Sequence, residues 1–189
     1  MGKPHALLRA GFPYLKTLGT KRLTDEPVDL AFGQEGRIYL LTWAPIKIIN
    51  YDEDDLGQMG IRKPEQAGPI EDGQLVWPHT IIVDSAENIY VSDEITHWIS
   101  VFSKDGEFLG RWGDHGNADG QLNRPAGIVF DADENMYVVD SLNHRIQKFT
   151  KDGKFLMHWG SFGVKDGEFN MPWGIALDAD GDIYISDWR

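Results

Sequence analysis

Short apolar runs alternate with polar turn sequences along most of the chain. Between Pro125 and Gly160 the runs read Ile-Val-Phe, Met-Tyr-Val-Val, Arg-Ile-Gln-Lys-Phe and Phe-Leu-Met-His-Trp, and the turns between them are rich in Asp, Asn and Gly. Alternation with a period of two residues, bounded by such clusters, is typical of β-strands joined by tight turns. We therefore predict four antiparallel strands in this stretch.

The same pattern recurs at a spacing of 47 residues. Four positions keep this spacing through three copies: Pro78, Pro125 and Pro172; Asp84, Asp131 and Asp178; Tyr90, Tyr137 and Tyr184; Asp93, Asp140 and Asp187. A more divergent copy precedes them at a distance of 51, with Pro27 and Tyr39 at the positions of Pro78 and Tyr90. Four-stranded repeats of about 40–50 residues indicate the blades of a β-propeller.

The predicted fold class is all-β, built from four-stranded antiparallel propeller blades. The expected parts are an N-terminal segment (1–26) with an outer strand near 14–19, a divergent first blade (27–77) with an inserted surface loop (57–77), a second blade (78–124), a third blade (125–171), and the first two strands of a fourth (172–189). About three and a half blades leave strand edges unpaired, so we expect a partial segment of a larger ring.

Composition narrows the classes of partner. The net charge of −12 disfavours nucleic acid, because a phosphate backbone would be repelled. No run of about 18 apolar residues is present, so no membrane span is expected. The absence of cysteine excludes disulfides and thiolate metal sites. The first residues lack the apolar core of a signal peptide, which favours a cytoplasmic location, although a mature chain without its leader would look the same.

The stretch around Asn143-His144-Arg145-Ile146 resembles the NHL repeat. The resemblance rests also on the Pro-x-Gly-Ile start, the Asp-x-Asp-x-Asn-x-Tyr turn, the Val-Asp end and the Lys-Asp-Gly hairpin, and it extends roughly over residues 27–189. It implies a propeller that usually has six blades. Members include binding scaffolds and, less often, lyases related to the peptidyl-α-hydroxyglycine α-amidating lyase; bacterial stand-alone members mostly lack an assigned activity.

In a propeller the residue after each Pro and the Asp that ends each second strand face one mouth of the central channel. This places His79 and Trp173 near Asp93, Asp140 and Asp187, with Glu94 and His144 further out on the same rim. In the amidating-lyase branch, a His from each of several blades holds a zinc ion at this kind of position. The equivalent residues here are Val28, Ala126 and Trp173, which cannot bind zinc, so a zinc site would need blades beyond residue 189.

The three repeated aspartates have two interpretations. Three carboxylates around a channel mouth could attract a cation such as calcium. An Asp at a strand end can instead accept hydrogen bonds from backbone N–H groups of the following turn, and its recurrence in each blade favours this structural role. His144 and Arg145 could bind a ligand, or Arg145 could pair with a neighbouring Asp and help to fix one blade against the next.

Aromatic residues that differ between blades are the better ligand candidates. Trp112 and Trp159 repeat at 47 residues and are expected in packing, whereas Trp43, Trp173 and Trp188 are expected near the rim and differ from their counterparts. We therefore predict a non-catalytic scaffold, without a cofactor, that binds a protein, peptide or carbohydrate-like ligand across its top face. The alternative is a metal-dependent lyase or hydrolase completed by further blades.

Overall fold

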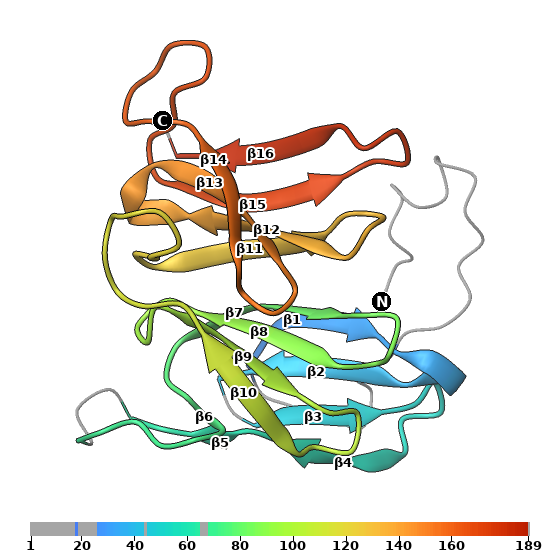
Figure 1. Ribbon diagram of the computed structural model, residues 1–189. Helices are drawn as coiled ribbons and strands as arrows, with labels where there is room; N and C mark the ends of the chain where they lie inside the picture. Colours follow the sequence, from blue (N-terminus) through green and yellow to red (C-terminus); the bar gives the residue numbers. More distant parts are fainter. Residues whose placement is uncertain (1–17, 19–25, 44, 65–67, 189) are drawn as a thin grey trace.

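The computed structural model describes residues 18, 26–43, 45–64 and 68–188. Three four-stranded antiparallel sheets and one two-stranded antiparallel sheet follow one another along the chain (Figure 1), and a small two-stranded parallel sheet lies in the connection after the first of them. The predicted blades are thereby confirmed as the architecture. The predicted outer strand near 14–19 lies outside the described residues, except for Leu18. No helix in the described part of the chain has the length and apolar character needed to cross a membrane.

Each blade is built by hairpins in sequence order. The first contains β1 (Pro27–Phe32), β2 (Ile38–Thr42), β3 (Ile46–Ile49) and β4 (Asp55–Met59). The second contains β7 (Pro78–Val83), β8 (Ile89–Asp93), β9 (Trp98–Phe102) and β10 (Phe108–Trp112). The third contains β11 (Pro125–Phe130), β12 (Asn135–Asp140), β13 (Arg145–Thr150) and β14 (Phe155–Trp159), and the two-stranded sheet contains β15 (Pro172–Leu177) and β16 (Ile183–Asp187). Two short 3-10 helices span Gln34–Gly36 and Ser141–Asn143.

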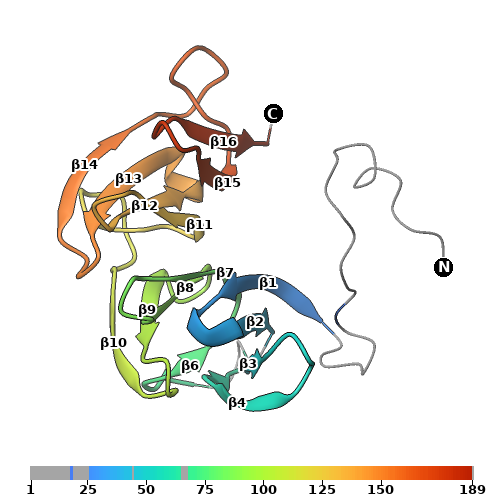
Figure 2. The same cartoon turned by 90° about the vertical axis from the view of Figure 1, so that its right-hand side faces the viewer.

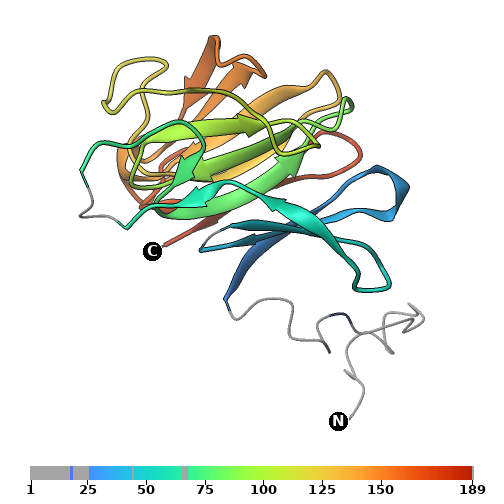
Figure 3. The same cartoon turned by 90° about the horizontal axis from the view of Figure 1, so that it is seen from below.

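The first strand of every blade faces the inside of an arc. Strands β1, β7, β11 and β15 lie toward the inner side in Figure 2, whereas β4, β10 and β14 lie at the outer edge. Seen from below, the first sheet, in blue and cyan, flanks the green second sheet (Figure 3). The strand pairs β1–β7, β7–β11 and β11–β15 are in contact, so residues at the start of these strands converge on one channel.

The hydrophobic core lies between the blades. The first cluster joins blades one and two through residues such as Tyr39, Leu41 and Phe102, which are at most 1% exposed. A second cluster joins blades two and three, and a smaller third cluster around Val139 and Ile146 joins blade three to β15 and β16. Side chains on both faces of a blade are therefore needed for stability, as in other stacked-repeat proteins.

The segments that connect blades fold back on themselves in a repeated way. Short parallel bridges join His115 to Leu122 and Phe162 to Phe169. The equivalent pair in the first connection is β5 (Ile61–Arg62) with β6 (Gln74–Leu75). The predicted surface loop 57–77 therefore contains the end of β4 and two short strands, because this connection uses the same parallel bridge as the others.

A second repeated contact joins neighbouring blades through a glutamate in a left-handed turn. Glu87 has φ 64° and Glu134 has φ 58°, at equivalent positions 47 residues apart. The backbone N–H of Gln34 donates to Glu87 Oε1 (2.9 Å), and the N–H of Ser85 donates to Glu134 Oε1 (2.7 Å). Each glutamate therefore holds the first hairpin turn of the preceding blade.

Candidate functional site

A cavity of about 510 Å³ opens at the mouth of the channel, between the first strands of all four sheets. Its walls consist of Val28, Asp29, Trp43, Trp77, Pro78, His79, Thr80, Glu94, Gly127, Ile128, Trp173, Gly174 and Ile175. Each blade contributes residues from the beginning of its first strand, and blades one and two also contribute the residue that follows the second strand. The size lies within the range of small-molecule sites.

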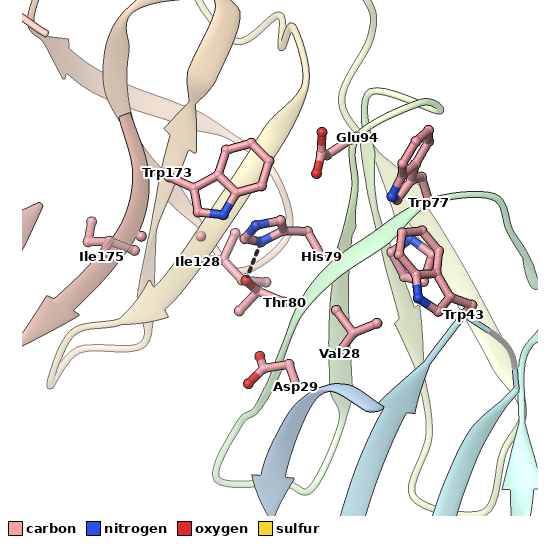
Figure 4. Close-up of a pocket in the computed structure, with 13 residues that line it drawn as sticks. Val28, Asp29, Trp43, Trp77, His79, Thr80, Glu94, Ile128, Trp173 and Ile175 are labelled. Carbon is pink, nitrogen blue, oxygen red and sulfur yellow. Dashed lines mark hydrogen bonds between the residues drawn. The ribbon is translucent and has the colours of Figure 1, made fainter. Parts of the chain in front are cut away.

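Two aromatic pairs form opposite walls of this cavity (Figure 4). The rings of Trp43 and Trp77 meet edge to face, with centroids 5.3 Å apart. On the other side, the His79 and Trp173 rings meet edge to face at 4.6 Å. Such pairs fix ring orientation at a gain of about 0.5–1.5 kcal/mol beyond area burial. The aromatic surfaces are thus held in place before any ligand arrives.

His79 forms its contacts with neighbouring side chains of the protein. Its Nδ1 lies 2.8 Å from the Thr80 hydroxyl. Burial lowers the pKa of His79, and the charge of Asp29 opposes this shift only in part. The imidazole is therefore neutral at pH 7. Within the described residues no group of three or more His, Asp or Glu side chains is close enough together to hold a metal ion.

Two carboxylates reach the cavity from different blades. Glu94 is 3% exposed, and its Oε2 lies 3.0 Å from Nη2 of Arg124. Burial raises the pKa of Glu94, and Arg124 opposes that rise. Asp29 accepts a hydrogen bond from the Ile81 N–H at 3.0 Å, and no cationic side chain of the described residues forms an ion pair with it. Asp29 therefore contributes a negative charge to the cavity.

The repeated aspartates bind the segments that lead into their own blades and do not line the cavity. Asp93 is fully buried and accepts hydrogen bonds from the N–H groups of Val76, Trp77, Ile95 and Thr96 at 2.7–3.1 Å. Asp140 accepts one from the N–H of Asn123 (2.6 Å), and Asp187 accepts one from the N–H of Asn170 (2.8 Å). Val76, Asn123 and Asn170 are again 47 residues apart. Each Asp therefore fixes the segment that leads into its own blade.

His144 has a repeated structural contact as well. The N–H of Met171 donates to Nδ1 of His144 (3.1 Å), and 47 residues earlier the N–H of Arg124 donates to Nδ1 of His97 (3.0 Å). Arg124 and Met171 precede a strand-starting Pro, and both have positive φ, at 56° and 58°. The histidine thus holds the left-handed residue at the start of the next blade. Its role in ligand binding stays a prediction.

This contact makes stability depend on pH. The pKa of His97 is lowered to about 4 by burial, together with the charges of His115 and Arg124. Between pH 6.5 and 4 the unfolded chain binds the proton and the folded one does not, so stability is complete above pH 6.5 and falls as the pH drops. After solvent screening we expect His97 to account for about 1–2 kcal/mol of this loss.

Urea unfolding of wild type and His97→Asn at a series of pH values measures this contribution. The Asn oxygen can replace Nδ1 as acceptor and Asn tolerates positive φ, so the two proteins should have similar stability at pH 7.5. The variant should lose less free energy of unfolding than wild type between pH 6.5 and 4. Parallel pH profiles would contradict the assignment to His97.

Of the predicted site residues, the structure brings Trp43, His79, Glu94 and Trp173 together in the cavity. Asp93, Asp140 and Asp187 instead bind the segments that lead into their own blades, and His144 binds Met171 at the start of the next sheet. Sequence reasoning missed Trp77 and Asp29, which also line the cavity. A signal was present, because Trp77 corresponds to Arg124 and Met171, and Asp29 corresponds to Thr80, Gly127 and Gly174. Both residues thus differ from their counterparts in the other blades, as Trp43 and Trp173 do.

Fold and cavity together define a β-propeller with its candidate site at the channel mouth. The sequence model of the NHL repeat matches residues 122–149 and 169–189. The chain thus carries NHL repeats in these two segments, and the solved structures similar to it share its propeller-like fold. A search of curated proteins found no match.

Several solved structures share the fold. Virginiamycin B lyase from Staphylococcus aureus is 16% identical with a TM-score of 0.61, over 86% of this chain and 49% of that chain. A protein of unknown function from Bacteroides thetaiotaomicron is 21% identical with a TM-score of 0.66, over 84% and 44%. A chain from a nidogen/laminin complex is 21% identical with a TM-score of 0.58, over 85% and 56%. The chain spans about half the length of these structures, and at such identities the likeness concerns the fold alone.

Proposed function

We propose that this NHL-repeat protein is a binding module that holds a ligand, or an exposed side chain of a protein partner, in the cavity at the channel mouth. The observation that carries the proposal is the convergence of non-repeating aromatic residues. Trp43 follows β2, Trp77 directly precedes β7 and Trp173 lies in β15, yet all three border one cavity of about 510 Å³. The proposal includes the six-bladed ring that the resemblance implies.

Two further features support recognition as the role. The repeated polar residues, such as Asp93 and Asp140, are fully buried and hydrogen-bonded within the fold. Six residues that border the cavity differ from at least two of their counterparts in the other blades, namely Asp29, Trp43, Trp77, His79, Glu94 and Trp173. Positions under selection for one ligand need different residues in each blade, whereas positions that hold equivalent blades together need the same residue.

Replacement of Trp173 should weaken ligand binding in the cavity. Trp173 is 38% exposed and forms one wall, so Trp173→Ala removes a large apolar surface from the cavity. We expect affinity to fall at least about tenfold, as for a central aromatic contact. Tryptophan fluorescence can be titrated with choline, maltotriose, a lysine tripeptide and a glutamate tripeptide, each with wild type and variant.

The matched control is Trp188→Ala, since Trp188 is 71% exposed and does not border the cavity. It should bind as wild type does. Equal loss in both variants, or unchanged binding in Trp173→Ala, would refute the proposed location. Binding or turnover that requires added divalent zinc would favour the lyase alternative.

A further inference from the structure

The charged side chains around the cavity favour a positively charged ligand. The ionisable side chains that line it are Asp29, Glu94 and His79. His79 is held neutral by burial, and Arg124, which pairs with Glu94, is not part of the lining. Asp29 has no cationic partner among the described side chains. A channel mouth with low-dielectric walls and this charge focuses a negative potential, which attracts cations and repels anions.

The aromatic side chains that form the walls of the cavity also favour a positively charged ligand. The face of an indole ring carries partial negative charge, and a cation within about 6 Å of the ring centroid is attracted to it, most strongly by Trp. The Trp43–Trp77 pair stands on one side of the cavity and Trp173 on the other (Figure 4). A cation between them would face indole rings from two directions.

The carboxylates complete the arrangement. Glu94 lies at one end of the space between the aromatic walls, and Asp29 lies at the other (Figure 4). Val28, Ile128 and Ile175 add apolar surface. An apolar group that carries a positive charge matches both kinds of lining, whereas a small hydrated metal ion would find no cluster of ligands among the described residues.

We propose that the cavity binds an alkylammonium group, supplied by a small organic amine or by a lysine side chain of a protein partner. This inference rests on the proposed binding function and specifies its ligand. The Trp side chains and Asp29 hold the cation, and the apolar residues hold its carbon substituents, whereas the charge of Glu94 is offset by Arg124.

A pair of isosteric probes tests the inference directly. Choline and 3,3-dimethylbutan-1-ol have nearly the same shape and differ in the positive charge, so calorimetric titration of both isolates the effect of that charge. We expect choline to bind at least about tenfold more tightly, with an affinity that falls as salt is added. Equal affinities would overturn the alkylammonium inference while leaving the binding function intact. Absence of choline binding beside binding of maltotriose would do the same.

Two charge-removing variants test whether Asp29 is the source of the attraction for the cation. Asp29→Asn keeps an oxygen that can accept from the Ile81 N–H, so the blade contact is preserved while the charge is removed. We expect about a fivefold to tenfold loss of choline affinity and no change for the neutral isostere. Asp133→Asn makes the same charge change on an exposed turn away from the cavity and should have no effect. Equal losses in the two variants would contradict a specific role of Asp29.

A third ligand distinguishes the source of the cation. Nα-acetyl-trimethyllysine amide presents the same ammonium group on a peptide backbone. Tighter binding than choline would support a protein side chain as ligand, and weaker binding would support a small amine. If neither cation binds and none of the uncharged or acidic probes binds, the alkylammonium inference and the binding function fail together.

Discussion

Asp140→Ala should destabilise the protein by about 3–5 kcal/mol, which is the largest effect expected of any single substitution considered. Asp140 is fully buried, and its Oδ2 accepts hydrogen bonds from Nε of Arg145 (2.7 Å), Nδ2 of Asn143 (2.9 Å) and Nε2 of Gln147 (2.9 Å). Its removal leaves Arg145, a residue that is 7% exposed, as a buried cation without its closest carboxylate. Urea unfolding followed by circular dichroism measures the loss.

The equivalent position in the last sheet provides the control. Asp187 is half-buried, and the β15–β16 sheet contributes less to the core. Asp187→Ala should therefore cost much less than Asp140→Ala. Similar losses at the two positions would show that the buried Asp140–Arg145 pair is not the source of the effect.

Glu87→Ala should have the second largest effect, a loss of about 2–4 kcal/mol. Glu87 is 4% exposed and joins blade two to blade one: Oε1 accepts from the Gln34 N–H and from the Tyr39 hydroxyl (3.0 Å), and Oε2 lies 3.5 Å from Nη1 of Arg37. The Tyr39 side chain is fully buried, so its hydroxyl would lose its acceptor in a place that water does not reach.

Glu87→Gln separates the hydrogen bonds from the charge. The amide oxygen can still accept from Gln34 and Tyr39, so this variant should lose only the contribution of Arg37 and remain close to wild type. Thermal unfolding of the three proteins gives the comparison. A Gln variant as unstable as the Ala variant would assign the effect to charge and contradict the importance of the Tyr39 contact.

The blade pattern could be predicted from the sequence because it depends on local residues. Pro starts β7, β11 and β15, and Asp ends β8, β12 and β16, so a spacing of 47 residues already places the strands. The first connection was harder to predict, since β5 and β6 are two residues long and form a parallel pair across 13 positions. Sequence periodicity does not detect so short a parallel contact.

The candidate site was predictable only in part. The rule that non-repeating rim residues bind ligands selected Trp43, His79, Glu94 and Trp173, which the structure brings to one cavity. The same rule also applies to Asp29. Asp29 is the second residue after Pro27, and this position alone does not show that its side chain turns toward the channel. The orientation of the side chain depends on the hydrogen bond from the Ile81 N–H of the next blade.

The sequence indicated which type of contact the repeated polar residues form, but it did not identify all of their partners. Arg145 pairs with an aspartate, as expected, and the partner is Asp140. The predicted turn contact of the aspartates is present at Asp93, which accepts from Ile95 and Thr96. Its contact with the segment before the blade could not be predicted, since Val76 and Asp93 are brought together by the β7–β8 hairpin and the chain that enters it.

The central claim is that ligands bind in the channel-mouth cavity, and the indole N–H resonances of the seven tryptophans test it most directly. Trp43, Trp77 and Trp173 border the cavity, whereas Trp98, Trp112, Trp159 and Trp188 do not. Assigned two-dimensional NMR spectra should be recorded during a titration with choline. We predict shifts of the first three resonances that saturate together, with the other four unchanged. Shifts confined to Trp98, Trp112, Trp159 or Trp188, or no shift with any of the probes, would contradict the account.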